Sequence, residues 1–96
     1  MKWVADELQH GAEVTFRPRG KSMEPLVKDR QGVTVAPCGE REIKKGDIVL
    51  CKVKGKYYLH KVLAVGDRGY LIGNNKGHTN GWTRQVFGYL KEKLDD

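Results

Sequence analysis

Short apolar runs separated by glycine-containing turns constrain the fold of this chain more than any other feature. Twelve of the 96 residues are glycine, and they are scattered between apolar runs that are only a few residues long. Runs of this length, bounded by turn residues, are typical of strands rather than helices. Because consecutive runs lie close together in the sequence, we expect them to pair as an antiparallel meander. The chain is therefore predicted to be mainly β.

One segment departs from this pattern. The spacing of Val4 and Leu8 predicts a short amphipathic helix over residues 2–10, ending near Gly11. The expected strands are residues 14–17, 32–37, 48–53, 57–65, 70–72 and 86–90. Residues 73–81 are predicted to be a polar loop, and the charged tail, residues 91–96, is predicted to be helical or frayed.

Length and composition predict one domain over residues 1–96, with a core from about residue 14 to residue 90. With 39% hydrophobic and 31% charged residues, the chain is expected to be globular and soluble. It contains no apolar run long enough to span a membrane and no signal peptide at its start. Cys38 and Cys51 fit no zinc spacing, so reduced structural thiols and a cytoplasmic location are expected.

The net charge of +6 permits an anionic partner. The basic residues, however, are spread along the whole chain and form no single stripe. No motif that combines basic and aromatic residues is present, so a nucleic-acid partner is not expected. The three histidines are too dispersed to predict a metal site, and no cofactor is expected.

Two short stretches point to chemistry. In GKSMEP, residues 20–25, Ser22 follows a glycine in a tight turn, and in YLHKV, residues 58–62, His60 lies in an apolar strand. A serine hydroxyl becomes a useful nucleophile when a neighbouring base takes its proton, and a neutral histidine can do this near neutral pH. The pair predicts a serine nucleophile and a histidine base. The alternatives are a helix N-cap for Ser22 and a half-exposed cross-strand position for His60.

Six motifs occur in the order seen in the signal peptidase and LexA-type serine peptidase superfamily, which this chain resembles. They are GKSMEP (20–25), GVTV (32–35), KGDIV (45–49), HKV (60–62), GNN (73–75) and FG (87–88). The resemblance implies a coiled antiparallel β-sheet, or partly open barrel, with a short N-terminal helix. It also implies that Ser22 is the nucleophile and that His60 occupies the position of the base, as in the archaeal and endoplasmic-reticulum branch.

The chain departs from the family pattern in two places. Many signal peptidases carry a hydroxyl residue two positions before the nucleophile, where this chain has Gly20. The histidine branch has an aspartate where this chain has Asn74, which can orient an imidazole but cannot stabilise its cation as a carboxylate would. His78 is a further candidate near the site, and Asp47 is a weaker candidate for the orienting role.

Strand geometry gives one more alternative. Neighbouring residues of a strand face opposite sides, so His60 and Lys61 cannot both point at Ser22. A register shifted by one residue would make Lys61 the base. The more continuous apolar face around His60 favours the histidine.

By the same resemblance, Met23, Gly20 and Phe16 are expected to contribute to a pocket for small substrate side chains. An extended peptide is expected to lie between the edge at residues 14–19 and the strand at residues 57–65. The sequence thus predicts a soluble serine endopeptidase that acts on a peptide or protein, such as one dedicated partner. The alternatives are a catalytically degenerate peptide-binding module and, third, a basic protein associated with nucleic acid.

Overall fold

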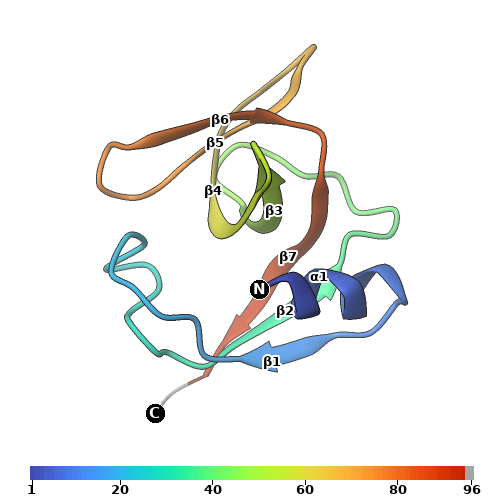
Figure 1. Cartoon of the computed structure of the whole chain (residues 1–96), viewed down its shortest axis with the longest axis vertical. Coiled ribbons are helices and arrows are strands. Elements are labelled where there is room, and N and C mark those ends of the chain that lie inside the picture. The colour runs from blue at the N-terminus through green and yellow to red at the C-terminus, as the bar shows by residue number, and fades with distance from the viewer. Residues whose placement is uncertain (95–96) are drawn as a thin grey trace.

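The computed structural model describes residues 1–94, which form one curled antiparallel sheet and a short helix (Figure 1). The elements in chain order are α1 (Lys2–Gln9), β1 (Val14–Phe16), β2 (Val33–Pro37), β3 (Ile48–Val53), β4 (Lys56–Gly66), β5 (Gly69–Gly73), β6 (Thr79–Thr83) and β7 (Val86–Lys93). The strands are ordered β1-β2-β7-β3-β4-β5-β6, and every pair is antiparallel. Within residues 1–94, no helix is long and apolar enough to cross a bilayer.

The sheet curls until its end returns to β3. The backbone N–H of Lys52 in β3 donates to the carbonyl of Gln85, just after β6, at 2.9 Å. The hydroxyl of Thr83 in β6 donates to the carbonyl of Lys52 at 2.6 Å. β6 and β3 are nevertheless not paired as strands, so the barrel stays open. This confirms the predicted mainly β fold with a coiled sheet and an N-terminal helix.

The core has two parts, and β3 contributes to both. Leu50 points into the first cluster, which contains residues of α1, β1 and β2, whereas Val49 and Cys51 point into the second cluster, inside the curl of β3, β4 and β5. All three side chains are fully buried. This alternation explains why β3 is almost continuously apolar, because both of its faces are covered.

The helix α1 belongs to the first cluster. Its side chains Val4, Ala5 and Leu8 are buried there, as the spacing of Val4 and Leu8 predicts. The helix ends at Gln9, and the chain turns through Gly11, whose φ of +89° is a conformation that glycine adopts without strain. Figure 1 shows α1 beside β1 and β2, with β7 running from the curl of the other strands into this layer.

Two expectations about loops were wrong. The predicted loop at residues 73–81 contains the start of β6, an edge strand whose Gly81 and Trp82 pair with Ile72 and Leu71 of β5. Its sequence, TNGWT, lacks the apolar alternation that marks the other strands, and it is held by backbone pairing with β5 and by side-chain hydrogen bonds of Asn80 and Thr83. The predicted frayed tail instead extends β7 to Lys93, which pairs with Val33 of β2. The end of the predicted tail, residues 95–96, lies outside the described residues.

Candidate active site

The turn that carries Ser22 is anchored to the first core cluster by the side chains that follow the serine. Met23 and Val27, which follow the serine, are each 4% exposed and pack in the first cluster. Because these two side chains point inward, the turn is held in place while Ser22 lines a surface cavity. Within the segment, the N–H of Gly20 donates to Asp29 Oδ1 at 2.7 Å. Gly20 has a φ of +114°, so the turn has a backbone shape that favours glycine.

Asn75, in the turn between β5 and β6, ties the same segment to the sheet. Its backbone N–H donates to the carbonyl of Ser22 at 2.9 Å, and its Nδ2 donates to the carbonyl of Glu24 at 3.0 Å. Lys61 Nζ donates to Asn75 Oδ1 at 3.2 Å. Asn75 is part of the GNN motif, but no role was predicted for it. These contacts make it the main link between the Ser22 turn and the β5–β6 hairpin.

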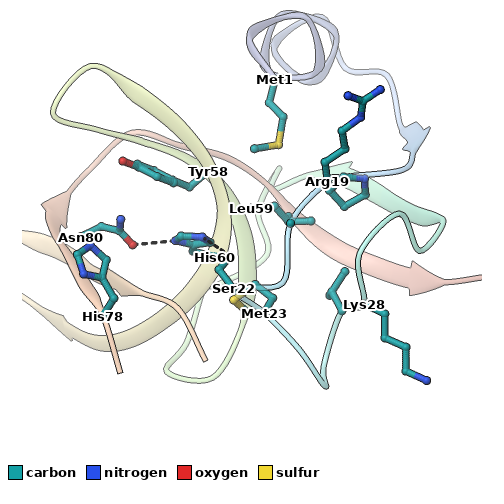
Figure 2. A pocket seen from close by; sticks show the side chains of 13 residues that line it. Met1, Arg19, Ser22, Met23, Lys28, Tyr58, Leu59, His60, His78 and Asn80 are labelled. Atoms are coloured by element: carbon teal, nitrogen blue, oxygen red, sulfur yellow. Dashed lines mark hydrogen bonds between the residues drawn. The ribbon is translucent and has the colours of Figure 1, made fainter. Parts of the chain in front are cut away.

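His60 lies in β4 and is 8% exposed. Its Nε2 is 3.1 Å from Ser22 Oγ, and its Nδ1 is 2.7 Å from Asn80 Oδ1 (Figure 2). An amide oxygen only accepts hydrogen bonds, so Nδ1 of the neutral ring carries the hydrogen and donates to Asn80. Nε2 is then free to accept the hydroxyl hydrogen of Ser22. This is the tautomer that a general base requires.

The surroundings of His60 favour its neutral form. Burial lowers the pKa of His60 below its ordinary value of 6.5. The hydrogen bond with Asn80 opposes this shift, and the nearby His78 adds to it in a smaller degree. The net effect is a lowered pKa, so the ring is able to accept a proton at neutral pH.

Tyr58, two residues before His60 on the same face of β4, stacks on the imidazole. The ring centroids are 4.8 Å apart and the ring planes meet at 29°. This contact restricts the orientation of the imidazole and covers one of its faces. Strand alternation places Tyr58 on the same face as His60, but the stacking contact was not predicted.

Asn80, rather than the predicted Asn74, lies beside the His60 ring. The side chain of Asn74 instead accepts hydrogen bonds from the backbone N–H groups of Lys76 and His78, at 2.8 and 3.0 Å, and so closes its own turn. The register of β5 and β6 brings Asn80 to the ring, because Gly73 pairs with Thr79 and the intervening residues form the turn. The contact of Asn80 with the ring could not be predicted from the GNN motif, because the start of the strand that carries Asn80 was expected to be a loop.

Other candidates lie at varying distances from this pair. Lys61 projects toward Asn75, on the side of β4 opposite His60, as strand alternation predicts. His78 lines the cavity. Asp47 accepts hydrogen bonds from Arg41 and from the backbone of Lys44, which is a role in its own turn.

A cavity of about 400 Å³ opens beside Ser22 and His60. Its lining consists of Met1, Pro18, Arg19, Gly20, Ser22, Met23, Val27, Lys28, Tyr58, Leu59, His60, His78 and Asn80. Gly20 and Met23, two of the three residues predicted for a substrate pocket, are part of this lining. Phe16 does not line the cavity: it packs against the first core cluster and meets Trp3 edge to face at 6.2 Å.

The cysteines offer no second nucleophile. Cys51 is fully buried, and burial raises the pKa of its thiol to about 12. Cys38 is free and partly buried, and burial raises the pKa of its thiol as well. Within residues 1–94, no group of three or more His, Cys, Asp or Glu side chains is arranged to hold a metal ion.

Comparison with known proteins identifies the family. The model of the Peptidase S24-like family matches residues 2–85, which is most of the 96-residue chain. Comparison with curated proteins gave no match, and neither did comparison with solved structures. The match covers the Ser22 turn, His60 and Asn80, and it agrees with the resemblance based on the six motifs. The chain belongs to the Peptidase S24-like family.

Proposed function

We propose that the protein is a serine endopeptidase in which Ser22 is the nucleophile and His60 is the general base. The observation that carries the proposal is the 3.1 Å separation of Ser22 Oγ and His60 Nε2 in a cavity open to a substrate. Hydrogen-bond reach between nucleophile and base is the geometric requirement for this chemistry. The lowered pKa of His60 supports the same role, because a neutral base is needed.

In this proposal Ser22 Oγ attacks the carbonyl carbon of the scissile bond while its proton passes to His60 Nε2. The new Oγ–C bond forms as the C–N bond breaks, and Nε2 returns the proton to the leaving amine. A water molecule then gives a proton to Nε2 and attacks the acyl carbon; the Oγ–C bond breaks as the acid product forms, and Nε2 returns this proton to Ser22 Oγ. Throughout, Nδ1 keeps its hydrogen and donates it in a hydrogen bond to Asn80 Oδ1, so Asn80 acts as a positioning residue.

The strand edges support an extended substrate. β5 pairs with the second half of β4, from Lys61 onward, so residues 56–60 pair with β3 alone. β1 pairs only with β2. Residues 58–60 of the β4 edge line the cavity, and the β1 edge leads into Pro18 and Arg19 of the lining; an extended peptide can add a strand to such an edge. This is the arrangement expected for a dedicated protein partner that presents an extended segment.

A degenerate binding module is the second candidate, and two observations favour it. The N–H of Gly20, in the position that carries a hydroxyl in many relatives, is already donated to Asp29 Oδ1. The partner of the His60 ring is an uncharged amide, which stabilises an imidazolium less than a carboxylate does. Such a module would hold the same peptide without cleaving it.

An active-site probe tests the proposal without knowledge of the substrate. Ser22 is the only serine of the chain, so a fluorophosphonate that labels an activated serine has a single target. We expect labelling at Ser22, mapped by mass spectrometry, with loss of labelling in Ser22→Ala and His60→Ala and retention in the control His10→Ala. The labelling rate should rise with pH to a plateau, with a midpoint below about 6.5.

Peptide libraries then establish cleavage. The parent protein and Ser22→Ala are incubated with a diverse library, and the products are read by mass spectrometry. Cleavage by the parent alone supports the peptidase. A folded parent that neither reacts with the probe nor cleaves any peptide would leave the binding module as the better explanation. A midpoint well above neutrality would point to an amine base, such as Lys61.

A further inference from the structure

The fully charged residues that line the cavity are both basic. Arg19 and Lys28 contribute to the lining, and within residues 1–94 no carboxylate does. Figure 2 shows the two basic side chains on the side of Ser22 opposite Asn80 and His78. The cavity therefore has one end with two positive charges and another end lined by amide and aromatic groups.

The segment around these residues is basic as well. Residues 17–30 contain five basic and two acidic side chains. Both acidic side chains are turned toward the backbone: Asp29 Oδ1 accepts from the N–H of Gly20, and Glu24 Oε2 accepts from the N–H of Asp29 at 3.3 Å. These carboxylates therefore bind the turn itself rather than neutralise Arg19 and Lys28, and the positive end of the cavity is left for a ligand.

We propose that the cavity takes an extended peptide with an acidic side chain close to the bond presented to Ser22. The inference rests on the proposed function, because it assumes that the peptide backbone passes Ser22. Arg19 precedes Ser22 by three residues, so their Cα atoms are at most about 11 Å apart. An extended peptide covers that distance in about three residues. The acidic side chain thus lies within about three residues of the bond, on one side of it only.

A peptide fits this cavity better than a nucleic acid does. The floor of the cavity is apolar, formed by Met23, Val27 and Leu59, which suits small side chains. Single-stranded nucleic acids bind through exposed aromatic faces combined with basic tracks. Tyr58, the aromatic residue of the lining, stacks on His60 and so has one face already covered.

Binding to Ser22→Ala tests the inference separately from catalysis. Short fluorescent peptides with a small-residue pair at the centre carry either Glu or Gln at one position on either side, and affinity is read by anisotropy. We expect the Glu peptides of one side to bind about three- to tenfold more tightly than their Gln counterparts at low salt, with the difference shrinking at high salt. The Glu peptides of the other side should show no such gain.

Charge-reversal variants locate the effect. Arg19→Glu with Lys28→Glu, in the Ser22→Ala background, should abolish or invert the preference for Glu. Lys45→Glu with Lys56→Glu makes the same change in net charge at exposed positions outside the cavity and should keep the preference. A milder pair, Arg19→Gln with Lys28→Gln, gives the same reading if the reversal variant fails to fold.

Three results would overturn the inference: equal affinity for Glu and Gln peptides, equal loss in both reversal variants, or tight binding of single-stranded DNA that the Arg19 and Lys28 changes abolish. The last would assign the basic end to a nucleic acid. Failure of the proposed function reads differently. A preference for Glu peptides without cleavage by the parent would support this inference and the binding module. Cleavage without any preference for Glu peptides would support the peptidase and contradict this inference.

Discussion

Replacing Asn80 by aspartate would put a carboxylate where an amide oxygen now lies, 2.7 Å from His60 Nδ1. The two side chains have nearly the same shape, so the change alters charge with little change in packing. A carboxylate in contact with a cation favours the charged form and typically shifts a pKa by about 1–3 units. Because His60 is 8% exposed, solvent screens this pair weakly. We expect the pKa of His60 to rise by about two units, which corresponds to about 2.7 kcal/mol of added stabilisation of the imidazolium.

The assay is an NMR titration of the His60 ring in the parent and in the variant. Asn74→Asp is the matched control, because it adds the same charge in the same hairpin. The Asn74 side chain bonds to backbone N–H groups of its own turn, so its effect on the ring should be much smaller. In the probe assay, the pH midpoint of Ser22 labelling should move upward with the pKa of His60.

The reasoning fails if the titration of His60 in Asn80→Asp coincides with that of the parent, or if Asn74→Asp produces the larger shift. Either result would mean that Asn80 does not face Nδ1 in solution. The test does not depend on any substrate, so it separates the geometry of the site from its activity.

Three further predictions follow from contacts around the site. Tyr58→Leu should slow labelling of Ser22 about three- to tenfold through loss of the stacking contact, whereas Tyr58→Phe should keep the rate within about twofold of the parent. Asn75→Ala removes the side-chain hydrogen bonds of that residue to Glu24 and Lys61 and should lower the free energy of unfolding by about 1–3 kcal/mol in urea titrations. The control Lys76→Ala, at an exposed position of the same turn, should change this free energy by less than about 0.5 kcal/mol. The folded-state pKa of His60 lies below the unfolded value near 6.5, so at pH values between the two the unfolded state binds more protons than the folded state. The contribution of His60 to the free energy of unfolding should therefore be fully present above about pH 6.5 and decrease as the pH drops toward the folded-state pKa. Replacing His60 with Gln should flatten that part of the stability profile, and an unchanged slope would contradict the assignment.

The sequence was sufficient for those parts of the fold where burial imposes a pattern. β3 has the predicted bounds, residues 48–53, because its apolar run is bounded by turn residues at both ends. The contact of Ser22 with His60 was also predictable, since each lies in a short motif that matches the family in order and spacing. In both cases the prediction depends on a short stretch of sequence and not on how distant strands pair.

The contacts that were missed depend on pairing rather than on local pattern. Asn80 reaches the ring of His60 because β6 pairs with β5, and the register shifts between Ile72 and Gly73. A shift of this kind changes which residues of β5 and β6 oppose each other. The sequence TNGWT has no apolar alternation from which the shift could be predicted. Asn74 was the natural choice from the motif, but an asparagine at the start of a tight turn can bond to the following backbone N–H groups instead.

Because the partner of the His60 ring is an uncharged amide, Tyr58 can be used to distinguish the peptidase from the binding module. Burial without a carboxylate keeps the ring neutral at lower pH, so more of the base is available, but each proton that the ring accepts is less well stabilised. A base with a lower pKa is also a weaker base, so a larger available fraction is offset by a smaller driving force for proton transfer. Within the described site the hydrogen bond to Asn80 favours the cation, and the stacked face of Tyr58 adds to this, because an aromatic face attracts positive charge. If Ser22 is the nucleophile, its reactivity should therefore depend on Tyr58 more strongly in the parent than in Asn80→Asp, where the carboxylate takes over that role. For a binding module, Tyr58 would affect peptide affinity alone, and the two substitutions would show no coupling in the labelling rate.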